Sequence, residues 1–95
     1  MPGDSIETTV QPSYISVGWM HLPKGKWHLF PRPGKTIELE YNGEAIQAVV
    51  ELYPRENVRG LRVPPKWLES NFAEKTRLVM TIIEPMKKYR IKVAK

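Results

Sequence analysis

The segment 51–62, ELYPRENVRGLR, gathers side chains that can recognise the edges of base pairs. An arginine guanidinium forms two hydrogen bonds to guanine O6 and N7, and an asparagine amide pairs in the same way with adenine N6 and N7. The residues of these types are Arg55, Asn57, Arg59 and Arg62. The same residues are ordinary in a solvated turn. The segment therefore indicates duplex recognition only if it projects from the rest of the fold.

Other residues that carry chemistry form no catalytic or metal-binding set. His21 and His28 have no third ligand at a spacing suited to zinc, and the chain contains no cysteine. Glu38 and Glu40 lie on one outward face of an expected strand, whereas catalytic carboxylates converge on a cleft. No nucleophile elbow and no phosphate-binding loop is present in the sequence. We expect a domain that is not an enzyme and that needs no cofactor or metal.

The composition is that of one small globular domain. The chain has 95 residues, of which 41% are hydrophobic, and its nine prolines and six glycines separate apolar runs. No apolar run approaches the roughly 20 residues of a membrane span, and the first residues, MPGDSIETT, lack the features of a signal peptide. We expect one domain over 1–95 with a flexible tail at 1–7. The expected location is the cytoplasm, or the nucleus in a eukaryote.

The charge is positive and unevenly distributed along the chain. Fifteen lysines and arginines oppose ten acidic residues, giving +5, and eleven of the fifteen follow position 50. A surplus of this size attracts polyanions without identifying them. A soluble domain that is simply basic remains the alternative at this point.

Hydrophobic periodicity predicts two hairpins. Apolar and polar residues alternate over 37–41 and again over 46–52, and Asn42-Gly43 between them suits a type I′ turn. The same alternation occurs over 78–82 and 89–93, where the return strand has one basic face. Earlier in the chain, TTVQPSYISVG and GWMHLP resemble two further strands, interrupted by proline and glycine.

Short helices are expected near 24–30 and 65–72, and the segments around them repeat. Each contains a tryptophan, ends at a phenylalanine and follows a proline, as expected for an apolar plug at the end of a small barrel. Matches at an offset of forty or forty-one are Pro23 with Pro64, Trp27 with Trp67, and Lys35-Thr36 with Lys75-Thr76. A strand, short helix and hairpin therefore occur twice. Two such units bury their apolar edges best against each other, in a nearly closed barrel.

The order of these segments resembles the B3-type DNA-binding pseudobarrel, which occurs in plant transcription factors and in certain bacterial restriction endonucleases. The resemblance covers 8–93, and its landmarks are Pro12-Ser13, Leu22-Pro23-Lys24, Tyr41-Asn42-Gly43-Glu44 and Trp67. It implies a mainly β, seven-stranded pseudobarrel with two short helices and a pseudo-twofold internal repeat. Glu74-Lys75 stands where the family commonly has Gly-Asp, and the connection within 10–20 is short. These departures favour a prokaryotic recognition domain over a plant transcription factor.

B3-type domains hold the major groove between two arms, and the resemblance implies the same arrangement here. The first arm would comprise Gln11, Ser13, Tyr14, Ser16, Trp19 and His21, with Lys24 behind it. The second would comprise Glu51, Tyr53, Arg55, Glu56, Asn57, Arg59 and Arg62. At the tip of the second arm we expect Arg55 and Asn57 to contact bases. Nearer the barrel we expect Arg59 or Arg62 to hold phosphates. Trp19 also suits a core position.

The implied partner is double-stranded DNA, bound sequence-specifically by a domain that is monomeric on its own and touches no membrane. The resemblance further implies a prokaryotic restriction system, with a nuclease or ATPase domain in the parent protein. An RNA-binding barrel or a protein-interaction module would also suit a basic strand face with aromatic residues. RNA recognition usually displays aromatic rings for base stacking. The arm candidates are mainly Arg, Asn, Glu and Ser, which favours duplex DNA.

Overall fold

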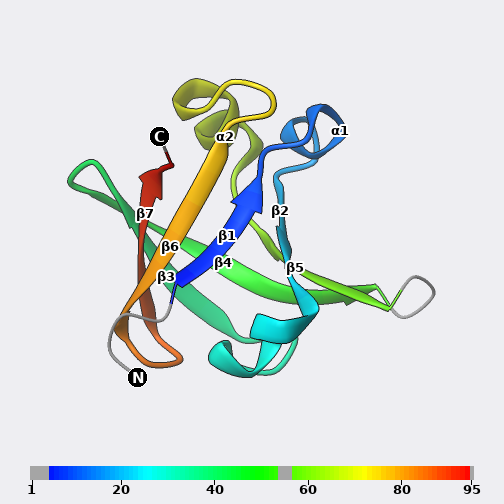
Figure 1. The fold of residues 1–95 in the computed structure, drawn as a ribbon, viewed down its shortest axis with the longest axis vertical. Coiled ribbons are helices and arrows are strands. Elements are labelled where there is room, and N and C mark those ends of the chain that lie inside the picture. The colour runs from blue at the N-terminus through cyan, green and yellow to red at the C-terminus, as the bar shows by residue number, and fades with distance from the viewer. Residues whose placement is uncertain (1–4, 54–56, 95) are drawn as a thin grey trace.

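The computed structural model describes residues 5–53 and 57–94, which form one sheet of seven strands, nearly closed into a barrel (Figure 1). In chain order the elements are β1 Ser5–Thr9, α1 Pro12–Ile15, β2 Trp19–Leu22, the 3-10 helix η1 Lys24–Leu29, β3 Thr36–Tyr41, β4 Glu44–Tyr53, β5 Val58–Arg62, α2 Pro65–Asn71, β6 Arg77–Glu84 and β7 Lys88–Val93. The predicted seven-stranded pseudobarrel is confirmed.

The sheet order is β1-β6-β7-β3-β4-β5-β2, and only β3 and β7 pair in parallel. The terminal strands of this order, β1 and β2, lie beside each other across the remaining gap (Figure 1). Leu39, Val50, Leu61, Leu78 and Met80 are fully buried in the interior that the strands enclose. Alternation along each strand places these side chains on the inward face.

Both predicted hairpins are confirmed. Asn42 and Gly43 have φ angles of 51° and 84°, so both central residues of the β3–β4 turn have the positive φ that a type I′ turn needs. In the β6–β7 hairpin the turn carries Met86 at φ 66°, and a register shift lies between Ile82 and Glu84. Each turn reverses the chain within a few residues, which fixes the register of the flanking strands.

The duplicated order of elements is also present. β2, η1 and the β3–β4 hairpin form the first unit, and β5, α2 and the β6–β7 hairpin form the second. The neighbours of the two hairpins differ, because β4 pairs with β5 whereas β7 pairs with β3. The two units thus occupy unequal positions in the sheet.

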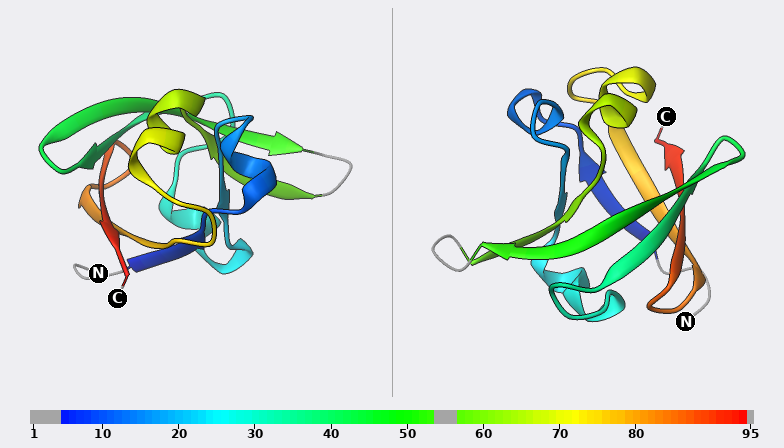
Figure 2. Two further views of the ribbon diagram at one scale, coloured as in Figure 1. Left: turned by 90° about the horizontal axis from the view of Figure 1, so that it is seen from above. Right: turned by 180° about the vertical axis from the view of Figure 1, so that it is seen from behind.

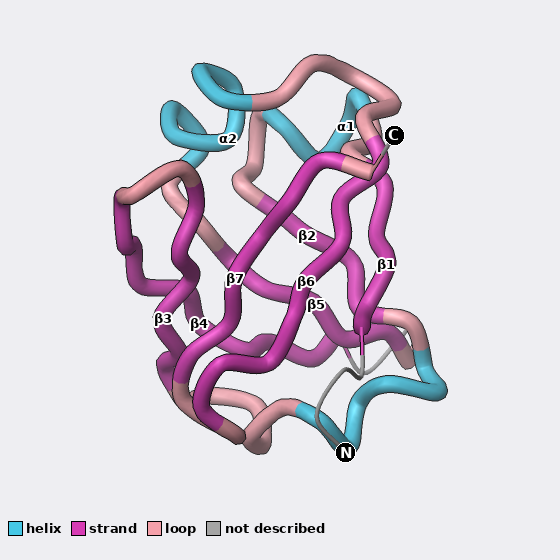
Figure 3. Tube along the Cα trace, turned by 60° about the vertical axis from the view of Figure 1, so that its left-hand side comes forward, coloured by secondary structure: helices cyan, strands magenta, loops and turns pink. Residues whose placement is uncertain are grey.

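The helices lie at the two ends of the barrel (Figures 2 and 3). Aromatic side chains close both ends. Next to η1, Phe30 stacks on Tyr89 with ring centroids 4.6 Å apart. At the opposite end, Phe72 packs against Tyr41 at 4.8 Å and against Trp67 at 5.5 Å. These contacts remove large apolar areas from water at the places where the sheet itself gives no cover.

The structure corrects two expectations for the start of the chain. Residues 5–7, expected in a tail, belong to β1, where Ile6 is fully buried and pairs with Met80 of β6; residues 1–4 lie outside the described part. The segment expected to continue as a strand past Pro12 instead forms α1. Proline has no N–H and a fixed φ, so it suits the first turn of a helix better than a paired strand.

Tyr89 should report on the integrity of the η1 end. Its hydroxyl donates a hydrogen bond to the Leu29 carbonyl oxygen at 2.6 Å, and burial raises its pKa to about 12. Because the unfolded value is about 10, the stabilisation is complete below pH 10 and is lost as the pH rises through about 12. Tyrosinate absorbance should therefore show a late step from Tyr89, together with unfolding.

Tyr89→Phe should abolish this late step and lower the free energy of unfolding at neutral pH by about 1 kcal/mol, the value of one hydrogen bond. Tyr14→Phe, at a partly exposed tyrosine of α1, serves as the control and should keep the late step. Absence of the late step in the parent protein, or its persistence in Tyr89→Phe, would contradict the assignment.

Candidate nucleic-acid interface

The two predicted arms converge on one side of the barrel. The first contains α1 and the turn that leads into β2, and the second is the β4–β5 ribbon, which projects beyond the barrel wall (Figures 1 and 2). The hollow between them, called here the inter-arm hollow, is lined by Ser13, Tyr14, Val17, Trp19, His21, Tyr53 and Val58. Residues far apart in the sequence thus share one concave surface.

A second concave area continues the surface toward β1. It is lined by Glu7, Thr8, Thr9, Gln11, Tyr14 and His21, so Tyr14 and His21 border both areas. Gln11 is exposed here, as expected for the first arm. The Thr8 hydroxyl is buried and has no hydrogen-bond partner among the described residues. The wall on this side is polar.

Trp19 forms the floor of the inter-arm hollow. Its side chain is on the outward face of the sheet, yet it is only 5% exposed, because the Tyr53 ring stacks on it at a centroid distance of 4.7 Å. Against the strand it lies so close to Gly60 that a Cβ at that position would be 2.2 Å from Trp19 Cζ2. Trp19 therefore supports the first arm from below, and its own surface is covered.

Arg62, Glu51 and Tyr53 form one polar cluster on the same outward face. Arg62 Nε donates to Glu51 Oε2 at 2.8 Å, and Arg62 Nη2 donates to Tyr53 Oη at 3.3 Å. The hydrogen bond to Glu51, followed by its charge, raises the pKa of Arg62. Three predicted residues of the second arm are thereby brought together.

Arg59, which the sequence offered as a phosphate contact, lies on the other face of the ribbon from Glu51, Tyr53 and Arg62. It is opposite Leu22 in the β2–β5 register, and its guanidinium carbon is 4.7 Å from the centroid of the Trp27 ring. Its Nε is buried without a hydrogen-bond partner among the described residues. The strand period of two explains this, because Arg59 shares the inward face with Leu61.

The remaining predicted residues are distributed unevenly. Asn57 is exposed at the start of β5 with φ 51°, whereas Arg55 and Glu56 lie outside the described residues. Lys24 is exposed at the start of η1 and lines neither concave area. Ser16 is exposed but borders a different hollow, on the far side of α1.

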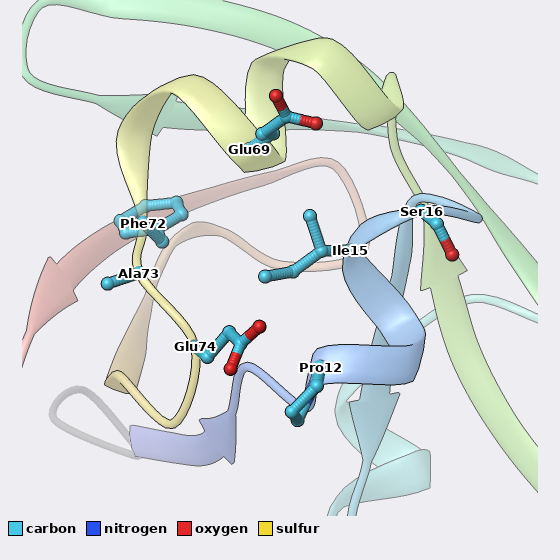
Figure 4. Close-up of a pocket in the computed structure, with 7 residues that line it drawn as sticks. All are labelled: Pro12, Ile15, Ser16, Glu69, Phe72, Ala73 and Glu74. Atoms are coloured by element: carbon cyan, nitrogen blue, oxygen red, sulfur yellow. The ribbon is translucent and has the colours of Figure 1, made fainter.

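That other hollow lies between α1 and α2 (Figure 4). Ile15 and Phe72 face each other across it, and the carboxylates of Glu69 and Glu74 stand at its rim. Two carboxylates repel a phosphate backbone at this end of the barrel. This end of the barrel is therefore unfavourable for a polyanion.

The basic face predicted for β7 is largely neutralised by β3. Lys88 Nζ lies 3.3 Å from Glu38 and 3.5 Å from Glu40, and Arg90 Nε lies 2.8 Å from Glu40. The hydrogen bond from Arg90 is the main cause that lowers the pKa of Glu40. This side of the barrel offers a polyanion less positive charge than the sequence suggested.

Sequence reasoning missed Val17, Val58 and Gly60. The two valines line the hollow as apolar surface between polar groups. Gly60 is the only glycine within a described strand. A glycine inside a strand often marks a place where another group approaches closely. The sequence therefore contained a sign of the close packing at Gly60.

Within 5–53 and 57–94, no group of three or more His, Cys, Asp or Glu side chains is placed to hold a metal ion. No helix in the same ranges has the length and apolar character needed to cross a membrane. The chain matches no family model, no curated protein and no solved structure. Its function must therefore be argued from the geometry of the two arms.

Gly60→Ala tests the floor of the hollow. The new Cβ would also lie 2.7 Å from the Met20 carbonyl oxygen, which is backbone and cannot move aside easily. We expect the free energy of unfolding to fall by about 1–3 kcal/mol, as for other overpacked sites, with an altered near-ultraviolet circular dichroism signal. Gly25→Ala is the control, since no atom lies within 4 Å of its Cβ position. Unchanged stability of Gly60→Ala would refute this close packing.

Proposed function

We propose that this domain binds double-stranded DNA sequence-specifically, with its two arms in the major groove. The observation that carries the proposal is the convergence of α1 and the β4–β5 ribbon on one hollow. The major groove admits a two-stranded β-ribbon, which is the form of the second arm. The first arm then lies against the adjacent DNA backbone or against base edges.

The chemistry of the arms suits base edges as well as phosphates. Phosphate contacts require donors only, whereas base edges present both donors and acceptors. Gln11, Ser13 and His21 supply both kinds of group on the first arm. On the second arm, Asn57 is exposed and Arg62 presents a guanidinium beside a carboxylate.

Recognition of single-stranded RNA is the second candidate, because aromatic rings line the hollow. Stacking platforms need exposed rings. The largest ring, that of Trp19, is covered by the Tyr53 ring and is 5% exposed. Tyr53 itself is 41% exposed. This arrangement supports duplex DNA over a stacked single strand.

The biological setting we propose is a prokaryotic restriction system. In that setting the domain selects the site, and a nuclease domain of the parent protein cleaves the DNA. The support for this finer statement is the pattern of landmarks in the sequence, together with the short β1–β2 connection that contains α1.

Fluorescence anisotropy with duplex DNA, duplex RNA and single strands tests the proposed function. Duplex DNA should bind most tightly, and log K should fall with log salt at a slope of about −0.9 for each phosphate contacted. Selection from random duplexes should return one enriched site. Equal or tighter binding to RNA would favour the second candidate, and no enrichment would exclude sequence-specific recognition.

Asn57→Gly tests the tip of the second arm. Asn57 has φ 51°, so glycine removes the amide without straining the turn, whereas alanine would add strain. If Asn57 contacts a base, the variant should lose about 1–3 kcal/mol of binding to the selected duplex and little to a scrambled one.

Asn42→Gly is the matched control, because Asn42 has the same φ of 51° in the β3–β4 turn, away from the hollow. It should bind both duplexes like the parent protein. An equal loss in both variants would contradict a role for Asn57 in recognition.

A further inference from the structure

Arg62 keeps part of its guanidinium available although two acceptors from β4 hold it. A guanidinium has five N–H donors. Nε is used by Glu51 and one hydrogen of Nη2 by Tyr53. Three donors remain, two on Nη1 and one on Nη2, and the side chain is 47% exposed. This is enough for a bidentate contact.

The support behind Arg62 is rigid. Tyr53, which accepts from Arg62, stacks on Trp19 with an interplanar angle of 24°, and Trp19 packs against Gly60. A guanidinium fixed in this way loses little conformational freedom when it binds. Fixed orientation suits a contact that must distinguish base edges, since phosphate contacts tolerate a mobile cation.

The partner charge also argues against a phosphate contact. Glu51 lies 2.8 Å from Arg62 Nε, so the pair is close to neutral as seen by a ligand. A phosphate next to Arg62 would also approach the Glu51 carboxylate, which repels it. A base edge carries no net charge and suffers no such repulsion.

We propose that the Arg62–Glu51 pair recognises one G·C base pair. Arg62 donates to guanine O6 and N7, while Glu51 Oε1, which forms no hydrogen bond with a described residue, accepts from cytosine N4. An A·T pair in the same orientation would present its adenine amino group to Arg62 and thymine O4 to Glu51, and both contacts would be unfavourable. This inference rests on the proposed function and replaces the expectation that Arg62 holds a phosphate.

The test starts from the site selected by the intact protein out of random duplexes. Arg62→Ala should lose preference at one G·C position by about tenfold or more. In the double variant Glu51→Ala/Arg62→Ala, the slope of log K against log salt should change by much less than one phosphate contact, because a nearly neutral pair is removed. Thermal unfolding measured by circular dichroism shows whether the variant remains folded.

Glu51→Gln gives a second test, because it should strengthen binding to a scrambled duplex rather than weaken it. It frees the charge of Arg62, so binding to a scrambled duplex should tighten and its salt dependence should steepen by up to about one contact. Preference at the same G·C position should fall, because the amide can turn a donor toward cytosine N4. If Glu51 were distant from the bound duplex, the variant would not tighten scrambled binding.

Arg90→Ala is the matched control. Arg90 Nε lies 2.8 Å from Glu40 with side-chain exposures of 47% and 26%, nearly those of Arg62 and Glu51 at 47% and 28%. It lies on β7, away from the projecting ribbon (Figure 1). It should leave the preference at every position unchanged.

Two results would overturn the inference. Uniform weakening of all duplexes by Arg62→Ala, with a salt slope lower by about one contact in the double variant, would make Arg62 a phosphate contact. This result would leave the proposed function intact. Absence of binding to any duplex by the intact protein would overturn the proposed function and the inference together.

Discussion

The packing of the Trp19 indole against Gly60 fixes the side chains that we propose to contact DNA. An indole on the outward face of a sheet is usually exposed to water, but here it is buried because residue 60 has no Cβ and Tyr53 covers the ring. The Tyr53 hydroxyl in turn holds Arg62. One missing methyl group thus sets the depth of the hollow and the orientation of the guanidinium above it.

Ion pairing decides which cations of this basic chain can meet a ligand. Lys88 and Arg90 are paired with acidic residues of β3. Exposed pairs of this kind contribute little to stability, about 0–1 kcal/mol each, so their main effect is to neutralise that wall. Arg62 is also paired, yet its partner stands beside it in the proposed interface. A net positive charge favours attraction to polyanions in general, whereas the pairing pattern decides which walls of the barrel present that charge.

The sequence predicted what depends on local chemistry and missed what depends on neighbours in space. The Asn42-Gly43 turn and the alternation around it required only φ preferences and a period of two, and both were right. The same period places Arg62 outward and Arg59 inward. Arg59 therefore lies on the opposite face of the ribbon from Arg62, which residue type alone does not indicate. The helix after Gln11 was missed because it is four residues long and buries none of them, so no periodicity marks it.

The repeated order of strand, short helix and hairpin accounts for the barrel. The projecting β4–β5 ribbon depends on a difference between the two copies of this order. β4 and β7 hold equivalent places in the two units, but β4 has ten residues and β7 has six. β4 pairs with β3 as far as Val49 and from Val49 onward pairs with β5. β7 pairs with β6 along its whole length. The projecting ribbon therefore forms where the first unit ends and the second begins, from β4 and β5. A strand that changes partners can leave β3 and remain in a sheet, because β5 continues to satisfy the backbone groups along one of its edges.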